Sequence, residues 1–557
     1  MNMALSFAAL AAIVGLVCVS NVAAVRNGDE VFQTKQPRGA FYVFADKAIH
    51  VVDPQTLKIQ KNITVDQTGA PLTNAKNKSR TWNDVAFVED AKDGKYYVFA
   101  NEGDIYTDAA GNEFSYVTVI DTQAAAIVGR VQVGALPVHG YSIPQLSQFW
   151  AHSDINGTFN VINVTSINAT AATVADFKTN TGHGKLLLDD SLYPEAYATN
   201  VNEQVIEQIN LPSQNRTNSF NYSSFLPDPT ICTGTHSVGY SNISQHAFFE
   251  CADNKGIFEW NTVTNTFVKF FANITGYVSV APGDDEVLVV GYDSNVNVLK
   301  PQANNVPAVP QYTFLVSGDP DLNPVYWSPS NTSTDEPAGN YYVYLALKQN
   351  TNIYNLQAAA KLGLDVTDDS YTSAPGDCQY ANSTATAKGG RRLLHGGDMD
   401  MDASSPSGKK LATGASNQVL TPQCGACAPG VAAANPKAYN ASMSGLAFVS
   451  LATLQGNASA NTDAQTTLIS AGAVAQTVNG DSDANQCSYG ESSRAAKRGG
   501  PWIATVADFP QPSLYIINAA NQSVHGFVAT ASHPTKIAWV PSRFGNPPVA
   551  ASSVGRG

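Results

Sequence analysis

The chain has 557 residues, of which 43% are hydrophobic and 14% charged, and its formal net charge is −13 at pH 7. This length is ample for a large buried core. The acidic balance, with no stripe of Lys and Arg to meet phosphates, argues against a nucleic-acid partner and favours a soluble extracellular protein that weakly attracts cations.

The N-terminus has the pattern of a secretory signal. An apolar run over residues 4–20, rich in Ala, Val and Leu, precedes residues 21–24, where small side chains stand before a cut after Ala24. We therefore expect residues 1–24 to be a signal peptide and the protein to be secreted, with an uncleaved N-terminal anchor as the alternative. No later stretch is long and apolar enough to cross a bilayer, so we expect no membrane span in the mature chain.

Glycosylation sequons agree with export. The pattern Asn-X-Ser/Thr, which accepts N-linked glycans in exposed loops, recurs along the whole chain. We therefore expect a glycoprotein if the host glycosylates. The sequon asparagines are Asn62, Asn77, Asn156, Asn163, Asn168, Asn215, Asn221, Asn242, Asn273, Asn331, Asn382, Asn440, Asn457 and Asn521.

Turn-rich β sequence recurs within residues 25–365, which we expect to form the first part of a β-propeller. In each copy an apolar run, a polar turn and a second apolar run are followed by a strand ending in Asp, Asn or Glu. The spacing of about 45 residues matches four strands per propeller blade. The clearest strand ends are residues 49–53, 117–121, 160–163, 204–207, 256–259, 352–355 and 514–518, with a degraded copy at 294–299.

These eight copies predict an all-β fold, a β-propeller of eight blades. Seven blades is the alternative, because the copy at 294–299 is weak. The last apolar run, residues 536–540, reads as a lone inner strand, whereas the first run, residues 41–44, has no inner strand before it. Pairing of these N- and C-terminal strands would complete one blade and close the ring, which removes exposed sheet edges.

Residues 366–500 break the repeat. They are rich in Ala, Gly and Ser, a composition typical of a low-complexity insertion, and we expect this segment to be partly disordered. The final propeller strands and ring closure are expected at 501–545, followed by a disordered tail at 546–557.

Six cysteines remain once Cys18 leaves with the signal. An even number in a secreted chain favours disulfides. The spacing of Cys424 and Cys427 suits a redox or metal site, but an oxidising compartment favours structural pairing with Cys378 and Cys487. The other two cysteines are Cys232 and Cys251.

Three histidines open the inner strands of three consecutive repeats. They stand in Pro137-Val138-His139, Gly182-His183-Gly184 and Gly234-Thr235-His236. In a propeller these positions meet at one mouth of the channel, and neutral imidazole is the commonest protein ligand for metals such as zinc. The pattern predicts a metal site, although a single histidine in a strand is more often a hydrogen-bonded structural residue.

Two further residues are candidate ligands. Folding about the turn at residues 144–147 places His139 opposite His152, where directly opposed Cβ atoms lie about 4.5–5.5 Å apart. Asp84 begins the equivalent inner strand of the preceding repeat, so its carboxylate is a candidate oxygen ligand.

The same folding, about the turn at residues 242–245, places His236 opposite Cys251. Cys232 lies just upstream on the loop that enters this strand. A Cys232–Cys251 disulfide would therefore pin the loop that carries His236, with a stabilisation of about 3 kcal/mol in the chain-entropy model.

These motifs resemble those of the secreted β-propellers of the AztD type, periplasmic zinc metallochaperones that hand zinc to a binding-protein-dependent importer, and more broadly those of YVTN-type propellers. The resemblance lies in Pro137-Val138-His139, in Gly182-His183-Gly184, and in residues 232–236 followed by residues 251–253. It implies an eight-bladed or similar propeller that holds Zn²⁺ on histidines at the channel. It also implies transfer of the metal by direct protein contact rather than catalysis.

The sequence thus favours metal chaperoning, buffering or delivery, with a metal ion and a recipient extracellular protein as partners. A non-catalytic glycoprotein scaffold is the alternative. An enzyme is favoured least, because the chain has no CxxCH haem motif, no nucleophile elbow and no HExxH helix, and no dedicated general base is evident.

Overall fold

The computed structural model describes most of the chain between residues 39 and 348 and between 500 and 541, together with five short strands between these regions. The described ranges are 39–45, 48–65, 82–90, 94–164, 174–178, 182–252, 255–281, 286–291, 295–315, 319–320, 325–327, 342–348, 380–381, 421–422, 445–450, 467–470, 492–494, 500–507, 513–520, 523–531 and 534–541.

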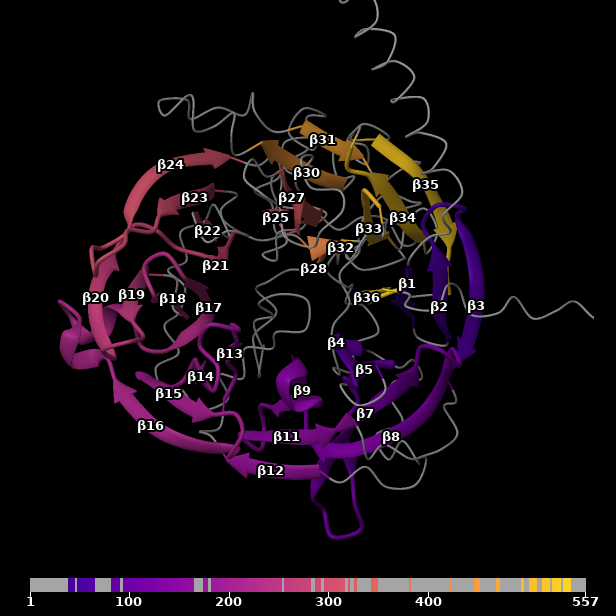
Figure 1. The fold of residues 1–557 in the computed structure, drawn as a ribbon, viewed down its shortest axis with the longest axis horizontal. Helices are drawn as coiled ribbons and strands as arrows, with labels where there is room; N and C mark the ends of the chain where they lie inside the picture. The colour runs from indigo at the N-terminus through magenta and orange to yellow at the C-terminus, as the bar shows by residue number, and fades with distance from the viewer. Residues whose placement is uncertain are drawn as a thin grey trace, which may run out of the picture.

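The protein is a β-propeller, as the repeats predict. Antiparallel sheets, most of four strands, stand like blades around a common centre (Figure 1). Among the described residues six sheets have four strands and two have five. We name a blade by the residue at the start of its inner strand, and the blade that contains both β1 and β36 is the closing blade.

The first three blades in chain order contain the following strands. The closing blade consists of β36 (Lys536–Pro541), β1 (Gly39–Phe44), β2 (Ala48–Asp53) and β3 (Lys58–Thr64). The Asp84 blade consists of β4 (Trp82–Glu89), β5 (Tyr96–Glu102), β7 (Glu113–Asp121) and β8 (Ala126–Gly134), with β6 (Tyr106–Thr107) also paired to β7. The His139 blade consists of β9 (Pro137–Ile143), β10 (Gln148–Ser153), β11 (Thr158–Asn163) and β12 (Val174–Lys178), with the 3₁₀ turn η1 (Pro144–Leu146) between β9 and β10.

The next three blades follow the same order from centre to rim. The His183 blade consists of β13 (Leu186–Leu187), β14 (Glu195–Ala198), β15 (Val205–Asn210) and β16 (Asn215–Asn221). Two 3₁₀ turns, η3 (Ser223–Phe225) and η4 (Pro229–Ile231), lead into the His236 blade, which consists of β17 (Thr235–Ser241), β18 (His246–Cys251), β19 (Ile257–Asn261) and β20 (Thr266–Phe271). The Tyr277 blade consists of β21 (Tyr277–Val280), β22 (Val287–Val290), β23 (Asn295–Lys300) and β24 (Val309–Leu315).

Two more sheets and a short ladder use the rest of the described chain. One sheet contains β25 (Asp319–Pro320), β26 (Val325–Trp327), β27 (Tyr342–Lys348), β30 (Gly445–Ser450) and β31 (Thr467–Ser470). The other contains β32 (Ser492–Arg494), β33 (Trp502–Ala507), β34 (Ser513–Asn518) and β35 (Ser523–Ala529). The ladder pairs β28 (Tyr380–Ala381) with β29 (Thr421–Pro422).

Burial follows the position of a strand within its blade. The second strands are buried at nearly every residue, and β18 along its whole length, because both of their faces pack against neighbouring blades. The rim strand β16 is exposed at nearly every residue and is rich in Asn, Ser and Thr. The core therefore lies between blades, and its largest fully buried side chains include Trp82, Trp150 and Trp260.

The two ends of the described chain share the closing blade, which is the terminal pairing that the sequence predicts. Strand β36 pairs antiparallel with β1, and Phe41 lies opposite Trp539. The two rings pack edge to face with centroids 4.9 Å apart, an arrangement that aromatic pairs favour. Gly39 is required beside this pair, because a Cβ at that position would overlap the Trp539 ring and the Val540 carbonyl.

Part of the range expected to be an insertion, 366–500, contributes strands to propeller sheets. Strand β30 pairs with β27, β31 pairs with β30, and β32 pairs with β33. Long connections separate these strands in sequence, so the 45-residue spacing is lost although the sheets continue. The expected signal peptide, the tail at 546–557 and the cysteines at 378, 424, 427 and 487 lie outside the described residues.

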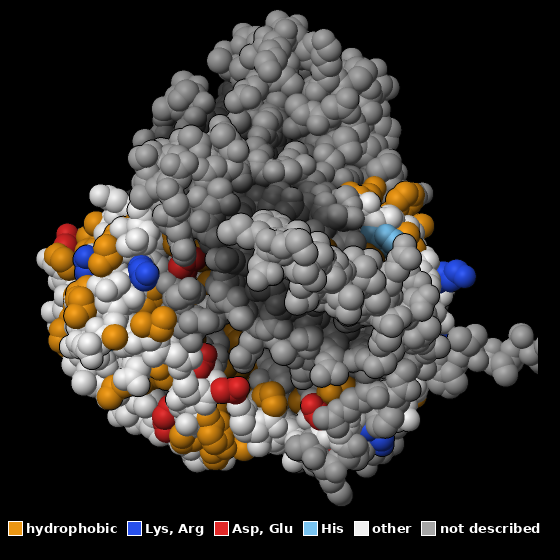
Figure 2. Space-filling view, turned by 45° about the horizontal axis from the view of Figure 1, so that its top comes forward, with side chains coloured by type: hydrophobic (Ala, Val, Ile, Leu, Met, Phe, Trp, Pro, Cys, Tyr) orange, Lys and Arg blue, Asp and Glu red, His pale blue; other side chains and the backbone are white. Residues whose placement is uncertain are grey.

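Two surface properties bear on partners. Within the described part of the chain, no helix is long and apolar enough to cross a membrane. On the face shown in Figure 2, the Lys and Arg side chains are scattered singly rather than gathered in a patch.

Candidate metal centre

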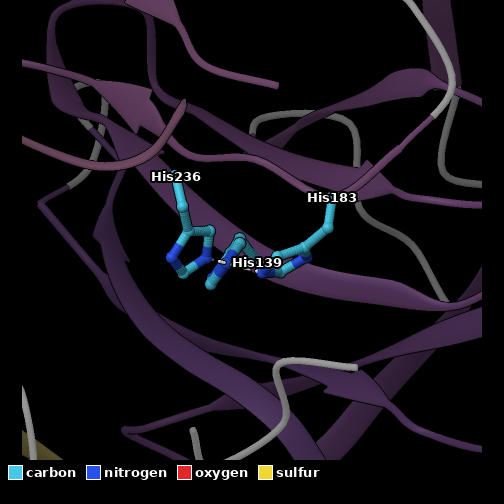
Figure 3. Close-up of side chains that lie close together, drawn as sticks. All are labelled: His139, His183 and His236. Carbon is cyan, nitrogen blue, oxygen red and sulfur yellow. Dashed lines mark hydrogen bonds between the residues drawn. The ribbon is translucent and has the colours of Figure 1, made fainter. Parts of the chain in front are cut away.

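Three histidines from three consecutive blades meet near the centre of the ring. His139 lies in β9, His183 just before β13, and His236 in β17. One ligand nitrogen from each ring can be chosen so that all three lie within 4.8 Å of one another. The ring centroids are 5.0 Å apart for His139 and His183, 4.5 Å for His183 and His236, and 6.3 Å for His139 and His236. Figure 3 shows the three rings pointing toward one another.

A β-bulge directs His236 toward the centre. The sequence predicts that His236 lies opposite Cys251, but Thr235 occupies that position, so this prediction is wrong. The register shifts between Thr235 and Val238, and His236 and Ser237 together face Glu250. An extra residue of this kind re-aims a side chain and often marks a functional site.

Similar irregularities occur at the same end of two other inner strands. In β9 the register shifts so that His139 pairs with His152 and Pro137 with Ser153, which leaves Val138 without an opposite residue. In β4 the register shifts between Trp82 and Asp84. The inner strands thus deviate from ideal pairing where the candidate ligands lie, which alternation along the sequence does not reveal.

A glycine allows the His183 and His236 blades to approach closely at the site. A Cβ on Gly234 would overlap the Val201 carbonyl of the His183 blade, and within that blade a Cβ on Gly184 would overlap the Thr199 carbonyl. The Thr235 N–H donates to the Asn200 carbonyl across the two blades at 2.7 Å, and within the His183 blade the Val201 N–H donates to the His183 carbonyl at 2.9 Å. The positions of His183 and His236 are therefore set by rigid backbone.

The Nδ1 side of each histidine faces a carboxylate. His183 Nδ1 lies 2.6 Å from Asp154 Oδ2, His236 Nδ1 lies 3.6 Å from Glu250 Oε2, and His139 Nδ1 lies 3.9 Å from Asp84 Oδ2. At hydrogen-bonding distance, as between Asp154 and His183, a carboxylate fixes the tautomer and ring orientation and makes the other nitrogen a better metal ligand. At 3.6 and 3.9 Å the other two carboxylates act through their charge. Asp154 and Glu250 are each 1% exposed.

The Nε2 atoms of His183 and His236 face each other at 2.7 Å. One of them donates its hydrogen to the lone pair of the other. If Asp154 accepts from His183 Nδ1, then His183 Nε2 carries the lone pair and His236 Nε2 donates. Both rings are then neutral, which is the form that binds metal.

The two remaining predicted ligands lie behind the histidine cluster. His152 is opposite His139 in the β9–β10 pair, as predicted, but its Nδ1 is 3.3 Å from Asp154 Oδ1 and its ring stacks on Phe159. Burial lowers the pKa of His152, and this outweighs the opposite effect of the Asp154 carboxylate. His152 and His183 therefore flank the Asp154 carboxylate from two blades.

Asp84 links two inner strands. Its Oδ2 accepts from the Gly140 N–H at 2.8 Å, and its Oδ1 accepts from the Val85 N–H at 2.8 Å. Among the described residues, the one cluster of three or more potential His, Cys, Asp or Glu ligands contains the three histidines and neither Asp84 nor His152. In this geometry Asp84 orients the strand that carries His139.

The disulfide expected from the sequence pins the entry to β17. Cys232 and Cys251 are bonded, with an S–S distance of 2.09 Å and Cα atoms 5.0 Å apart, and both are fully buried. Beside them the Ala252 N–H donates to the Gly234 carbonyl at 2.9 Å. The disulfide and this hydrogen bond thus both tie the segment that leads to His236 to the end of β18.

Sequence reasoning missed Tyr277. Its hydroxyl oxygen lies 3.3 Å from His236 Nε2, and its ring packs edge to face on the imidazole, with centroids 4.9 Å apart. The signal was the dipeptide Gly276-Tyr277, which repeats Gly182-His183 in a later blade. The tyrosine stands where the other blade has a histidine, so a pattern of histidines does not include it.

The donor set suits a transition metal of the zinc type. Zn²⁺ binds imidazole nitrogen at about 2.0–2.1 Å in tetrahedral sites, and three histidines with an oxygen donor form a known class of zinc site. The three rings converge, carboxylates lie behind them, and a hydroxyl lies at one edge. The three rings could therefore hold a metal ion if their ligand nitrogens drew together from the separations of up to 4.8 Å seen here.

Comparison with known proteins gives no family. No protein-family model and no curated protein sequence matches this chain. Among solved structures, apo AztD from Citrobacter koseri aligns with a TM-score of 0.43 at 8% identity, covering 90% of this chain and 98% of its own. A protein from Lactobacillus plantarum aligns with a TM-score of 0.37 at 13% identity (56% and 90%), and a chain of the mitotic checkpoint complex with 0.38 at 11% (54% and 80%). Because these similarities are low, the fold assignment rests on the strand pairing itself.

Proposed function

We propose that this protein is a secreted metal-binding propeller of the AztD type, which holds Zn²⁺ on His139, His183 and His236 and acts in zinc chaperoning, buffering or delivery. The observation that carries the proposal is the convergence of three imidazoles from three blades within 4.8 Å, each with a carboxylate on its Nδ1 side. A structural role for one buried histidine would not require the other two to meet it.

The charges around the centre support a divalent cation. Asp154 and Glu250 are buried directly behind two of the ligands, and their negative charge stabilises a cation held between the rings. Neutral imidazole is a borderline-soft ligand that suits Zn²⁺, Cu²⁺ and Ni²⁺ better than Mg²⁺ or Ca²⁺. Zinc is the first candidate because three imidazoles are a known protein ligand set for a tetrahedral zinc ion, which takes a fourth donor.

Exposure indicates a route for transfer. The His139 side chain is 13% exposed, whereas those of His183 and His236 are each 4% exposed. An ion held by the three rings would therefore exchange past His139, and a recipient protein would receive it on that side. This accounts for delivery by contact, without a catalytic step.

The test is metal content. The protein is expressed with its own leader, purified without a histidine tag, and its bound metals are measured by mass spectrometry. We expect about one zinc per chain in the wild type and none in the variant carrying His139→Ala, His183→Ala and His236→Ala. The control is His525→Ala, because this histidine lies on the rim strand β35 with its ring against Trp502.

Two outcomes would contradict the proposal. Wild-type protein that takes up no zinc, even when supplied with it at micromolar concentration, would favour the non-catalytic glycoprotein scaffold. Zinc retained in the triple variant would place the metal elsewhere in the chain.

A further inference from the structure

We propose that the hydroxyl oxygen of Tyr277 is the fourth protein donor of the metal centre. The inference rests on the proposed function, since it concerns the same ion. It adds a residue from a fourth consecutive blade, so that four neighbouring inner strands supply one ligand each.

Tyr277 occupies in its blade the position that His183 occupies in another. Each follows a glycine with an unusual backbone angle, φ +132° at Gly276 and φ +135° at Gly182. Side chains other than glycine rarely adopt this conformation. A Cβ on Gly276 would also overlap the Val290 carbonyl. The same glycine backbone conformation thus precedes a ring that points toward the centre in both blades.

The inner strands carry this arrangement around the ring. Strand β21, which begins at Tyr277, contacts β17, which carries His236, just as β17 contacts β13, which follows His183. The four donors therefore come from β9, the start of the His183 blade, β17 and β21, in the order of the blades in Figure 1.

The distance from Tyr277 to His236 matches tetrahedral coordination. Bonds of about 2.0–2.1 Å at tetrahedral angles place neighbouring donor atoms about 3.3–3.4 Å apart. The Tyr277 oxygen lies 3.3 Å from His236 Nε2, the nitrogen that faces the other histidine, and this hydrogen bond already sets the two atoms at the spacing of neighbouring donors. The His183–His236 separation of 2.7 Å is a hydrogen bond, and it would open by roughly 0.6 Å when an ion binds both nitrogens. The shared hydrogen would then move to Nδ1 of His236, on the Glu250 side, so that Nε2 offers its lone pair to the ion.

Packing holds the hydroxyl in place. Tyr277 is 1% exposed, and the Lys185 ammonium lies over its ring, 4.3 Å from the centroid. Such a cation–π contact fixes the plane of the ring. The oxygen is therefore presented to the centre before any ion binds, which reduces the cost of ordering a ligand.

Asp84 is the competing oxygen donor, and its geometry differs. Both of its carboxylate oxygens accept backbone N–H groups, and it approaches the Nδ1 side of His139 at 3.9 Å. Coordination by Asp84 would have to replace the Gly140 hydrogen bond. Coordination by Tyr277 forms one metal–oxygen bond and releases the hydroxyl proton to water, with no change in oxidation state.

The test uses Tyr277→Phe, which removes the oxygen and keeps the ring. Purified protein is stripped of metal and loaded with Cu²⁺ as a spectroscopic probe, because phenolate bound to Cu²⁺ absorbs in the visible by charge transfer and imidazole alone does not. Zinc affinity is measured in parallel by competition with a chromophoric chelator. The matched control is Tyr515→Phe in β34, a partly buried tyrosine of another blade.

We expect the charge-transfer band in the wild type and in Tyr515→Phe, and its loss in Tyr277→Phe. We also expect the zinc affinity of Tyr277→Phe to be at least tenfold lower, because removing a group that only supports a ligand already lowers affinity by about ten- to hundredfold. A band that persists in Tyr277→Phe overturns the proposal. So does weaker zinc binding without any band in the wild type, because the hydroxyl would then contact a metal-bound water. Wild-type protein that binds neither ion overturns the proposed function as well, whereas metal lost only in the histidine variants overturns the fourth donor alone.

Discussion

His183 and His236 are 53 residues apart in the chain, yet their Nε2 atoms lie 2.7 Å from each other. Gly234, at the contact between their two blades, permits this approach, and the buried Asp154 carboxylate holds the opposite side of the His183 ring, while Glu250 lies 3.6 Å behind His236. Two imidazoles so placed share a hydrogen now and are positioned to share an ion instead.

The carboxylate behind His183 should control metal affinity. Asp154→Asn keeps the shape of the side chain but removes the charge that orients His183 and raises the basicity of its Nε2. We expect a zinc affinity about 10- to 100-fold lower, measured by chelator competition. Asp108→Asn, in an exposed turn, is the control and should leave the affinity unchanged. Equal zinc affinities in Asp154→Asn and Asp108→Asn would show that Asp154 does not control metal binding.

The buried His152 should make metal-free protein less stable in mild acid. Burial lowers its folded-state pKa below the usual 6.5, so below about pH 6.5 the unfolded chain binds a proton that the folded protein does not. The free energy of unfolding contributed by this group is therefore lost as the pH falls through 6.5 toward the folded-state pKa, by at most about 1.4 kcal/mol per pH unit.

Melting temperatures of wild type and His152→Gln, at pH 7.5 and pH 5.5, check this prediction. The melting temperature of His152→Gln should fall less than that of the wild type between pH 7.5 and pH 5.5. An equal or larger loss in His152→Gln would mean that other groups cause the acid sensitivity.

The glycine beside His236 should tolerate no side chain. In Gly234→Ala the new Cβ would overlap the Val201 carbonyl, which belongs to rigid backbone. We expect a stability loss of about 1–3 kcal/mol, the usual cost of overpacking, together with weaker zinc binding because the two blades must move apart. Thermal unfolding and chelator competition measure the two effects. Gly111→Asn is the comparison, since its turn has open space and Asn tolerates the positive φ of 88° there better than most residues, so we expect a smaller loss and unchanged zinc binding.

The disulfide should be inert in the native protein and stabilising. Cys232 and Cys251 are both fully buried, so reductant should reach them only after unfolding, as thiol labelling with and without denaturant will show. Replacing both with serine should cost about 3 kcal/mol, by loss of the loop closure across a sequence separation of 19, and should lower the melting temperature. Rapid labelling of the native protein by a thiol reagent after mild reduction would contradict this account.

Several features of the fold follow from local pattern. The apolar runs at residues 41–44 and 536–540 predicted strands that pair, and β1 and β36 do pair. The opposition of His139 and His152 follows from strand alternation about one short turn. The second prediction succeeds because an antiparallel hairpin is defined by the residues of its two strands and the turn between them. The first succeeds because a closed ring leaves each of the two incomplete terminal runs only the other as a partner.

Other features depend on details of strand pairing that the sequence pattern does not encode. The bulge at His236 shifts its register relative to Cys251, and Glu250 occupies the place opposite that bulge. Strands β30, β31 and β32 join propeller sheets from within a stretch whose composition suggests none. Neither feature leaves a trace in residue spacing. The bulge shifts the pairing by one residue within a single hairpin, and β30 pairs with β27 across a long connection.

The sequence alone determined the all-β class, the repeat, the terminal strand pairing and the three histidines at equivalent positions. Only the tertiary structure decided that the rings meet within 4.8 Å, that carboxylates from Asp154, Glu250 and Asp84 stand behind them, and that Tyr277 lies at their edge. The reason is physical: repeat spacing places a residue on a strand, but the distance between donor atoms is set by how closely neighbouring blades pack, and that depends on the glycines and backbone hydrogen bonds at their contact.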